Sequence, residues 1–152
     1  MKLAEALLLR ADLQKKIASL RERVVANAVV QENEAPHEDP NGLLDEAVDV
    51  LEQLEELVAR IHRTNLAAQL PDGRTLTEAI ARRDRLQQQH SLLTAALAGC
   101  RKEPDRYSVR EIKWVATMKV SKLQKQSDDL AKKLRELNAR IQETNWRAEL
   151  AD

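Results

Sequence analysis

The sequence predicts an all-α protein made of long antiparallel helical hairpins. The chain of 152 residues has three glycines, four prolines and no phenylalanine, and it is rich in Leu, Ala, Glu, Arg, Lys and Gln, which favour long helices. Its apolar residues recur at spacings of three and four, as in packed helices. Nearly the same segment also occurs twice, at 57–70 and 137–150. We therefore expect duplicated hairpins that form a four-helix bundle or coiled-coil-like domain.

The first half of the chain predicts two helices. The first should run from about Leu3 to Val30, and the second to about Leu66, after a break at 31–40 that contains two prolines. Asp39 before Pro40 is typical of an N-cap followed by proline at the first helical position. The expected buried seams are Leu3, Ala6, Leu13, Ile17, Leu20 and Val24, then Leu43, Ala47, Val50, Leu54, Leu57, Ile61 and Thr64, with Leu44, Leu51 and Val58 widening the second seam.

The second half predicts two more helices after a turn at 71–73. Thr75 with Glu78 is a capping box that should start a helix from Leu76 to about Ala98, with Gly99 as the C-cap. Residues 110–118 alternate well enough to be extended or a short strand. The expected seams are Ala79, Leu86, Leu93 and Leu97, then Leu123, Ser127, Leu130, Leu134, Leu137, Ile141 and Thr144.

The repeated segments align with constant offsets. The offset is 73 in the first helix of each half, as from Leu3 to Leu76, and 80 in the second, as from Ile61 to Ile141. Chance similarity is the alternative, but the shared Arg-Ile-x-x-Thr-Asn uses residues that helix interiors disfavour. We expect one domain, 1–152, built of two hairpins at about 3–70 and 76–150, which bury their wide faces against each other about a pseudo-twofold axis.

Polar residues recur at matching seam positions. In antiparallel hairpins Arg10 should lie near Thr64 and Asn65, and Arg83 near Thr144 and Asn145. Their flanking arginines and counter-charges would be Arg60, Arg140, Glu5 and Glu78. One interpretation is that these layers fix the register of a Leu-rich core. The other is an anion or small-ligand pocket, because paired arginines suit carboxylate or phosphate.

The two halves carry opposite charge at the same place in the repeat. From Glu32 to Glu56 there are ten acidic residues and no Lys or Arg, whereas from Arg101 to Lys125 there are eight basic and three acidic residues. These segments could attract each other within the chain, pair between subunits of a homo-oligomer, or, for the basic one, bind RNA. The predicted interaction residues are Glu38, Asp39, Asp45, Glu46, Arg106, Tyr107, Arg110, Lys113 and Trp114.

The aromatic and chemically reactive residues suggest no enzyme. Trp114 should plug an interface or cap the core, and His90 should be a hydrogen-bonded seam residue. No catalytic constellation, metal site or cofactor motif is evident: Glu52, Glu55 and Glu56 lack a second acidic cluster, and Cys100 has no base partner. A single cysteine fits a reducing compartment. No apolar run approaches the ~20 residues of a membrane span, so we expect a cytoplasmic protein with no membrane partner.

Four segments carry a resemblance to a known family: "MKLAEALLLRADLQKKI", "ARIHRTN", "REIKWVAT" and "LQKQSDDLAKKLRELNARIQETNW". Over nearly the whole chain they resemble short bacterial proteins labelled septicolysin or septicolysin-like. The resemblance implies a helical fold without an established activity, and its label implies a secreted cytolysin. No residue with an assigned role carries over.

The residues together predict a non-enzymatic cytoplasmic protein that acts through self-association or protein–protein interaction. RNA binding through 101–125 is one alternative, and a septicolysin-type membrane-active toxin is another.

Overall fold

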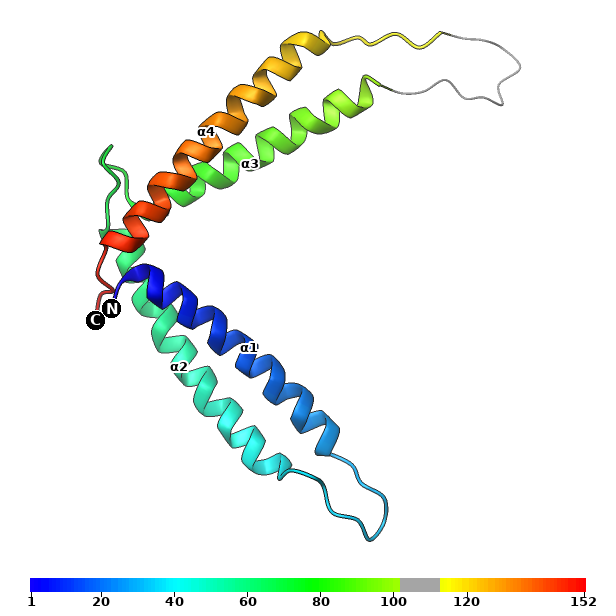
Figure 1. Ribbon diagram of the computed structural model, residues 1–152, viewed down its shortest axis with the longest axis vertical. Helices are drawn as coiled ribbons and strands as arrows, with labels where there is room; N and C mark the ends of the chain where they lie inside the picture. The colour runs from blue at the N-terminus through cyan, green and yellow to red at the C-terminus, as the bar shows by residue number, and fades with distance from the viewer. Residues whose placement is uncertain (102–112) are drawn as a thin grey trace. The chain divides into compact units, whose positions relative to one another are not determined.

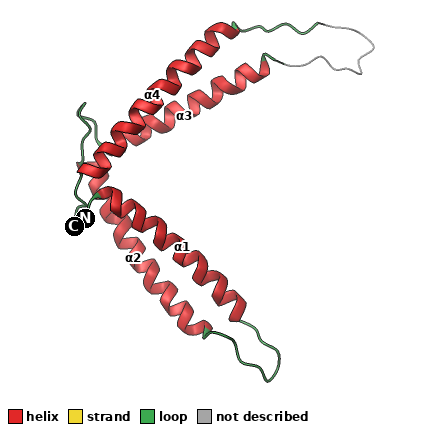
Figure 2. Cartoon of the chain, viewed as in Figure 1, coloured by secondary structure: helices red, strands yellow, loops and turns green. Residues whose placement is uncertain are grey.

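The described part of the chain folds into helices joined by loops, as the sequence predicts. The computed structural model describes residues 1–101 and 113–152, and within these ranges it contains helices and no strand (Figure 1, Figure 2). The helices are α1 (Leu3–Asn27), α2 (Pro40–Ala67), α3 (Leu76–Gly99) and α4 (Val120–Arg147). The helices pair as hairpins, α1 with α2 and α3 with α4, so the predicted fold class is confirmed.

The helix starts follow the predicted capping residues. The Asp39 carboxylate accepts hydrogen bonds from the backbone N–H groups of Asn41 (3.0 Å) and Gly42 (3.1 Å), which fixes the start of α2 at Pro40. Thr75 and Glu78 form the predicted capping box at the start of α3. The hydrogen bonds lower the pKa of the Glu78 carboxyl, with the Thr75 backbone N–H as the largest cause.

Two predicted helix ends are wrong. α1 ends at Asn27 and not near Val30, because the Asn27 side chain donates to the Arg23 carbonyl (2.9 Å) and accepts from the Glu38 N–H (3.0 Å). This amide ties the end of the helix to the following loop. Gly99 is the last residue of α3 and not its cap; Cys100 caps the helix with right-handed backbone angles.

The expected strand at 110–118 is absent from its described part. Residues 113–118 form neither helix nor strand, and residues 110–112 lie outside the described residues. Among the described glycines, Gly73 in the predicted turn is the one with a positive φ, of 84°, a backbone angle that favours glycine.

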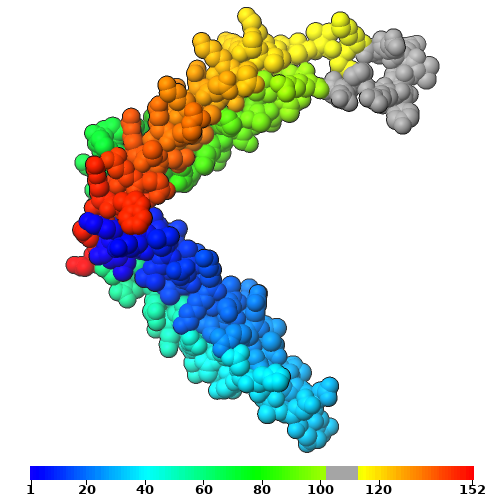
Figure 3. Space-filling view, viewed as in Figure 1, coloured from blue at the N-terminus to red at the C-terminus, as the bar shows by residue number. Residues whose placement is uncertain are grey.

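The chain divides into two compact units, which we describe separately. Unit 1 comprises Met1–Gln69 and Glu143–Asp152, and unit 2 comprises Leu70–Gln142. In unit 1, α1 and α2 lie side by side (Figure 3). Their core is Leu20, Leu43 and Val50, against which pack Leu13, Ile17, Val24 and Ala47. The mutual burial of the two hairpins stays a prediction.

Matched positions of the repeat are buried in both halves. Matched pairs that are buried in each half include Leu3 and Leu76, Ala6 and Ala79, Leu43 and Leu123, Val50 and Leu130, Leu57 and Leu137, Ile61 and Ile141, and Thr64 and Thr144. One pair of seam positions differs in chemistry. Where α1 and α2 carry Ile17 and Ala47, α3 and α4 carry His90 and Ser127, whose Nε2 and Oγ atoms lie 3.2 Å apart in a hydrogen bond. The expectation that His90 is hydrogen-bonded is confirmed.

Candidate functional site

The Thr-Asn segment of α2 holds the C-terminal residues of the chain. Thr64, which is 3% exposed, donates its hydroxyl to the Arg60 carbonyl (2.9 Å) and accepts the Ala151 N–H (2.9 Å). The Arg60 Nε donates to the Ala151 carbonyl (2.8 Å), and its Nη2 lies 3.7 Å from the Asp152 carboxylate. We call this set of contacts the tail clasp. It places the polar residues of one predicted layer against the chain's own backbone.

A short antiparallel bridge continues the tail clasp to the start of α1. The Leu3 N–H donates to the Ala148 carbonyl (2.9 Å), and the Leu150 N–H donates to the Met1 carbonyl (2.9 Å). The Lys2 ammonium pairs with the Glu149 carboxylate, which lowers the pKa of that carboxyl. The last residues of the chain are therefore anchored on both helices of unit 1.

Unit 2 repeats two of these contacts at the aligned positions. The Leu70 N–H donates to the Arg74 carbonyl (2.8 Å), as Leu150 does to Met1. The Arg140 Nη1 lies 3.9 Å from the Asp72 carboxylate, as Arg60 lies near Asp152. The sequence analysis missed both aspartates. Their signal was present, since "LPD" at 70–72 and "LAD" at 150–152 keep the offset of 80.

The predicted arginine layers differ from the observed contacts. Arg83 donates to the carboxylate of its chain neighbour Asp84 (2.9 and 2.7 Å), and its place beside Thr144 and Asn145 stays a prediction. Glu5 and Glu78 each accept the backbone N–H at their own helix start, and Arg74 is the arginine whose charge helps to lower the pKa of the Glu78 carboxyl. Arg10 and Asn65 are half-buried, and Asn145 is buried.

These contacts bear directly on the predicted anion pocket. In unit 1 the Arg60 guanidinium already binds the Ala151 carbonyl and faces the Asp152 carboxylate. An external carboxylate or phosphate would have to displace the chain's own tail. Arg60 and Thr64 of this layer bind the backbone of Ala151, and the register interpretation stays a prediction.

The predicted acidic residues are largely engaged within their own hairpin. The Arg23 Nε donates to the Glu38 carboxylate (2.9 Å), and Lys16 lies 2.7 Å from Glu46. These bonds lower the pKa of the Glu38 and Glu46 carboxyls. Asp39 caps α2 and Asp45 is exposed. Two of these four acidic residues, Glu38 and Glu46, are therefore neutralised by basic residues of α1.

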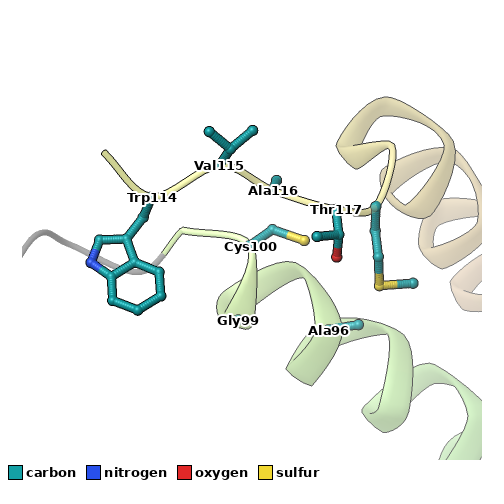
Figure 4. A pocket seen from close by; sticks show the side chains of 8 residues that line it. Ala96, Gly99, Cys100, Trp114, Val115, Ala116 and Thr117 are labelled. Atoms are coloured by element: carbon teal, nitrogen blue, oxygen red, sulfur yellow. The ribbon is translucent and has the colours of Figure 1, made fainter. Parts of the chain in front are cut away.

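The predicted basic surface is described only in part. Arg106, Tyr107 and Arg110 lie outside the described residues. Lys113 is exposed, and Trp114 is 59% exposed, so Trp114 does not cap the core. Trp114 lines an open pocket of about 370 Å³ at the end of α3 (Figure 4), together with Ala96, Gly99, Cys100, Val115, Ala116, Thr117 and Met118.

Residues 1–101 and 113–152 contain neither a cluster of metal ligands nor a membrane-spanning helix. No group of three or more His, Cys, Asp or Glu side chains in these ranges could hold a metal ion. None of the helices is both long and apolar enough to cross a membrane.

Fold and contacts define a class of protein: its described residues form helical hairpins, and the second helix of each hairpin places an arginine near the aspartate of a Leu-x-Asp segment. The chain belongs to DUF6847, a family of unknown function that matches residues 10–150. The chain is 37% identical to a functionally unknown conserved protein from Corynebacterium diphtheriae. That crystal structure matches with a TM-score of 0.92 and covers 99% of this chain and 98% of the other. A search of curated proteins found no match. The family description carries no septicolysin label, so the implied membrane activity stays a prediction.

Proposed function

We propose that this protein is a non-enzymatic protein of the cytoplasm that acts by associating with itself or with another protein. One observation carries the proposal. Three apolar side chains on one face of α2 remain about half exposed: Leu44 by 52%, Val48 by 46% and Leu51 by 48%. An apolar stripe at helical spacing outside the core is the usual mark of an association surface.

The second repeat supports this interpretation. At an offset of 80, the three exposed positions of α2 correspond to Gln124, Asp128 and Ala131 of α4. Core positions of the two helices keep their apolar character at Leu43 with Leu123 and at Val50 with Leu130, although Ala47 corresponds to Ser127. The hairpin fold therefore does not need apolar residues on this face, and another requirement explains their presence in α2.

Light scattering of the purified chain over a series of concentrations and salt conditions tests the self-association half. We expect a mass above that of the 17.3 kDa monomer at high concentration. For the other half, immobilised protein is used to capture partners from a lysate, with Leu51→Glu as the matched bait. A strict monomer whose captured proteins are unchanged by Leu51→Glu contradicts the proposal.

One observation favours RNA binding as a second candidate. Lys113 and Trp114 are adjacent and exposed in the basic segment 101–125, and an exposed ring beside a cation suits stacking on an unpaired base. A titration of single-stranded RNA followed by tryptophan fluorescence tests it. Binding should weaken as salt rises. No affinity at low salt rejects this function.

A further inference from the structure

An ion pair identifies the two sides of the α1–α2 hairpin. Lys16 of α1 and Glu46 of α2 lie 2.7 Å apart and span one side of it. Each residue turns a helix by about 100°, so a position two residues away lies about 200° round the axis. Ala18 and Leu44 are two residues from Lys16 and Glu46. They therefore lie on the side opposite the ion pair.

This opposite side carries exposed apolar residues on both helices, which on α1 lie beside Gln14, Arg21 and Glu22. On α1 it carries Ala18 and Val25, and on α2 it carries Leu44, Val48 and Leu51, all of them exposed. We call these five residues the apolar face. The small side chains of α1 leave an open hollow of about 640 Å³, lined by Gln14, Ile17, Ala18, Arg21, Glu22, Val25 and Ala26. In knobs-into-holes packing, projecting side chains such as these leucines insert into hollows of the facing helix.

The two helices that share the apolar face have opposite charge. α1 carries five basic and three acidic residues, whereas α2 carries six acidic and two basic residues. The exposed charged residues beside the face are Lys15, which pairs with Asp12, and the neighbours Arg21 and Glu22 on α1, against Asp45 and Glu52 on α2, so the division rests on the net charge of the two helices. The face is therefore self-complementary: a twofold copy can lay positive α1 on negative α2 at both contacts.

We propose that the apolar face binds the same face of a second copy of this chain, with α1 of each copy on α2 of the other. This inference rests on the proposed function and names its partner. An axis parallel to the helices gives this antiparallel contact twice and completes a four-helix bundle from two chains. The alternative twofold, with α1 on α1 and α2 on α2, places like charges together. The aligned face of α4 is polar at Gln124 and Asp128, so a second copy supplies the complementary apolar face.

Sedimentation velocity of the full chain, with matched variants, tests the contact. Leu51→Ala, which keeps the helix propensity, should raise the dimer dissociation constant about 30-fold, and Leu51→Glu about 100-fold. The control is Leu92→Glu, because Leu92 of α3 is 72% exposed and outside the apolar face. It should change the constant by less than about 2-fold. A wild-type monomer at all concentrations, or Leu51→Ala as weak as the control, overturns the proposal.

Charge reversal tests which helix meets which. Lys15→Glu and Glu52→Lys should each weaken the dimer about 5-fold at low salt, and the double variant should recover most of the loss. Additive losses in the double variant overturn the α1-on-α2 arrangement. The proposed function and the proposed contact fail on different results. If Leu51→Ala leaves self-association unchanged, the apolar face is not the contact, but the proposed function still holds. If the chain is a strict monomer with no specific partner, both the contact and the proposed function are refuted.

Discussion

Replacing Thr64 with valine tests the tail clasp. Valine keeps the shape of threonine but loses the hydroxyl, which bonds to the Ala151 N–H and the Arg60 carbonyl, both at 2.9 Å. Thr64 is 3% exposed, so water cannot readily replace the hydroxyl. Leaving a polar group at such a site without its partner costs about 1–3 kcal/mol. We expect Thr64→Val to lower the free energy of unfolding by that amount.

The repeat supplies a matched control at Thr144. Thr144 is also buried, and it occupies the same position in α4. The residue that corresponds to Ala151 in the other half is Pro71, which has no N–H to donate. Thr144→Val therefore removes no hydrogen bond from an aligned tail amide, and its cost should be smaller by about 1 kcal/mol.

Urea unfolding followed by circular dichroism measures both variants, each in the full chain and in a chain shortened by Ala151 and Asp152. In the shortened chain the Thr64 hydroxyl has lost its amide partner, so Thr64→Val should cost about 1 kcal/mol less there. Equal losses for Thr64→Val and Thr144→Val would refute the reasoning, as would a Thr64→Val cost that the shortened tail leaves unchanged.

Three further predictions use the same measurement. Leu20, 1% exposed in the core of unit 1, should cost about 3 kcal/mol when changed to alanine, whereas Leu92→Ala should cost under about 0.5 kcal/mol. Ser127→Ala or His90→Ile alone should destabilise by about 1 kcal/mol, and the double variant, which restores the apolar pair of the first repeat, should recover the loss. The Lys16 ammonium lowers the pKa of the Glu46 carboxyl. The ion pair therefore stabilises the fold above the ordinary carboxyl pKa of ~4.3, and this stabilisation is lost as the pH falls through the lowered pKa. Glu46→Gln should therefore flatten the pH dependence of the urea midpoint between pH 6 and 3.

Helix positions were predictable because local residues decide them. Asp39 with Pro40, and Thr75 with Glu78, place two helix starts from contacts within three residues. The end of α1 was missed because it depends on Asn27 accepting a hydrogen bond from Glu38, eleven residues on. Val29 and Val30 continue the apolar pattern past that point, so periodicity alone overran the helix.

The partners of the arginines could not be predicted in the same way. The hairpin register correctly places Thr64 and Arg60 in one layer, but it does not say that the last residues of the chain return to that layer. Arg83 donates to Asp84 beside it, whereas Glu78 accepts the Thr75 N–H at the helix start. Competition between nearby acceptors is decided by three-dimensional geometry, which a spacing rule does not contain.

Divergence between the repeats indicates where selection acts differently on the two halves. Most core positions stay apolar in both, as Val50 and Leu130 do, with His90 and Ser127 as the hydrogen-bonded exception, because either hairpin fails without its seam. The exposed face behaves otherwise, since Leu44 faces solvent in one repeat where Gln124 does so in the other. An exposed leucine carries a solubility cost that glutamine avoids. Its retention in only one copy is best explained if that copy alone meets a partner, which makes α1–α2 the first place to mutate.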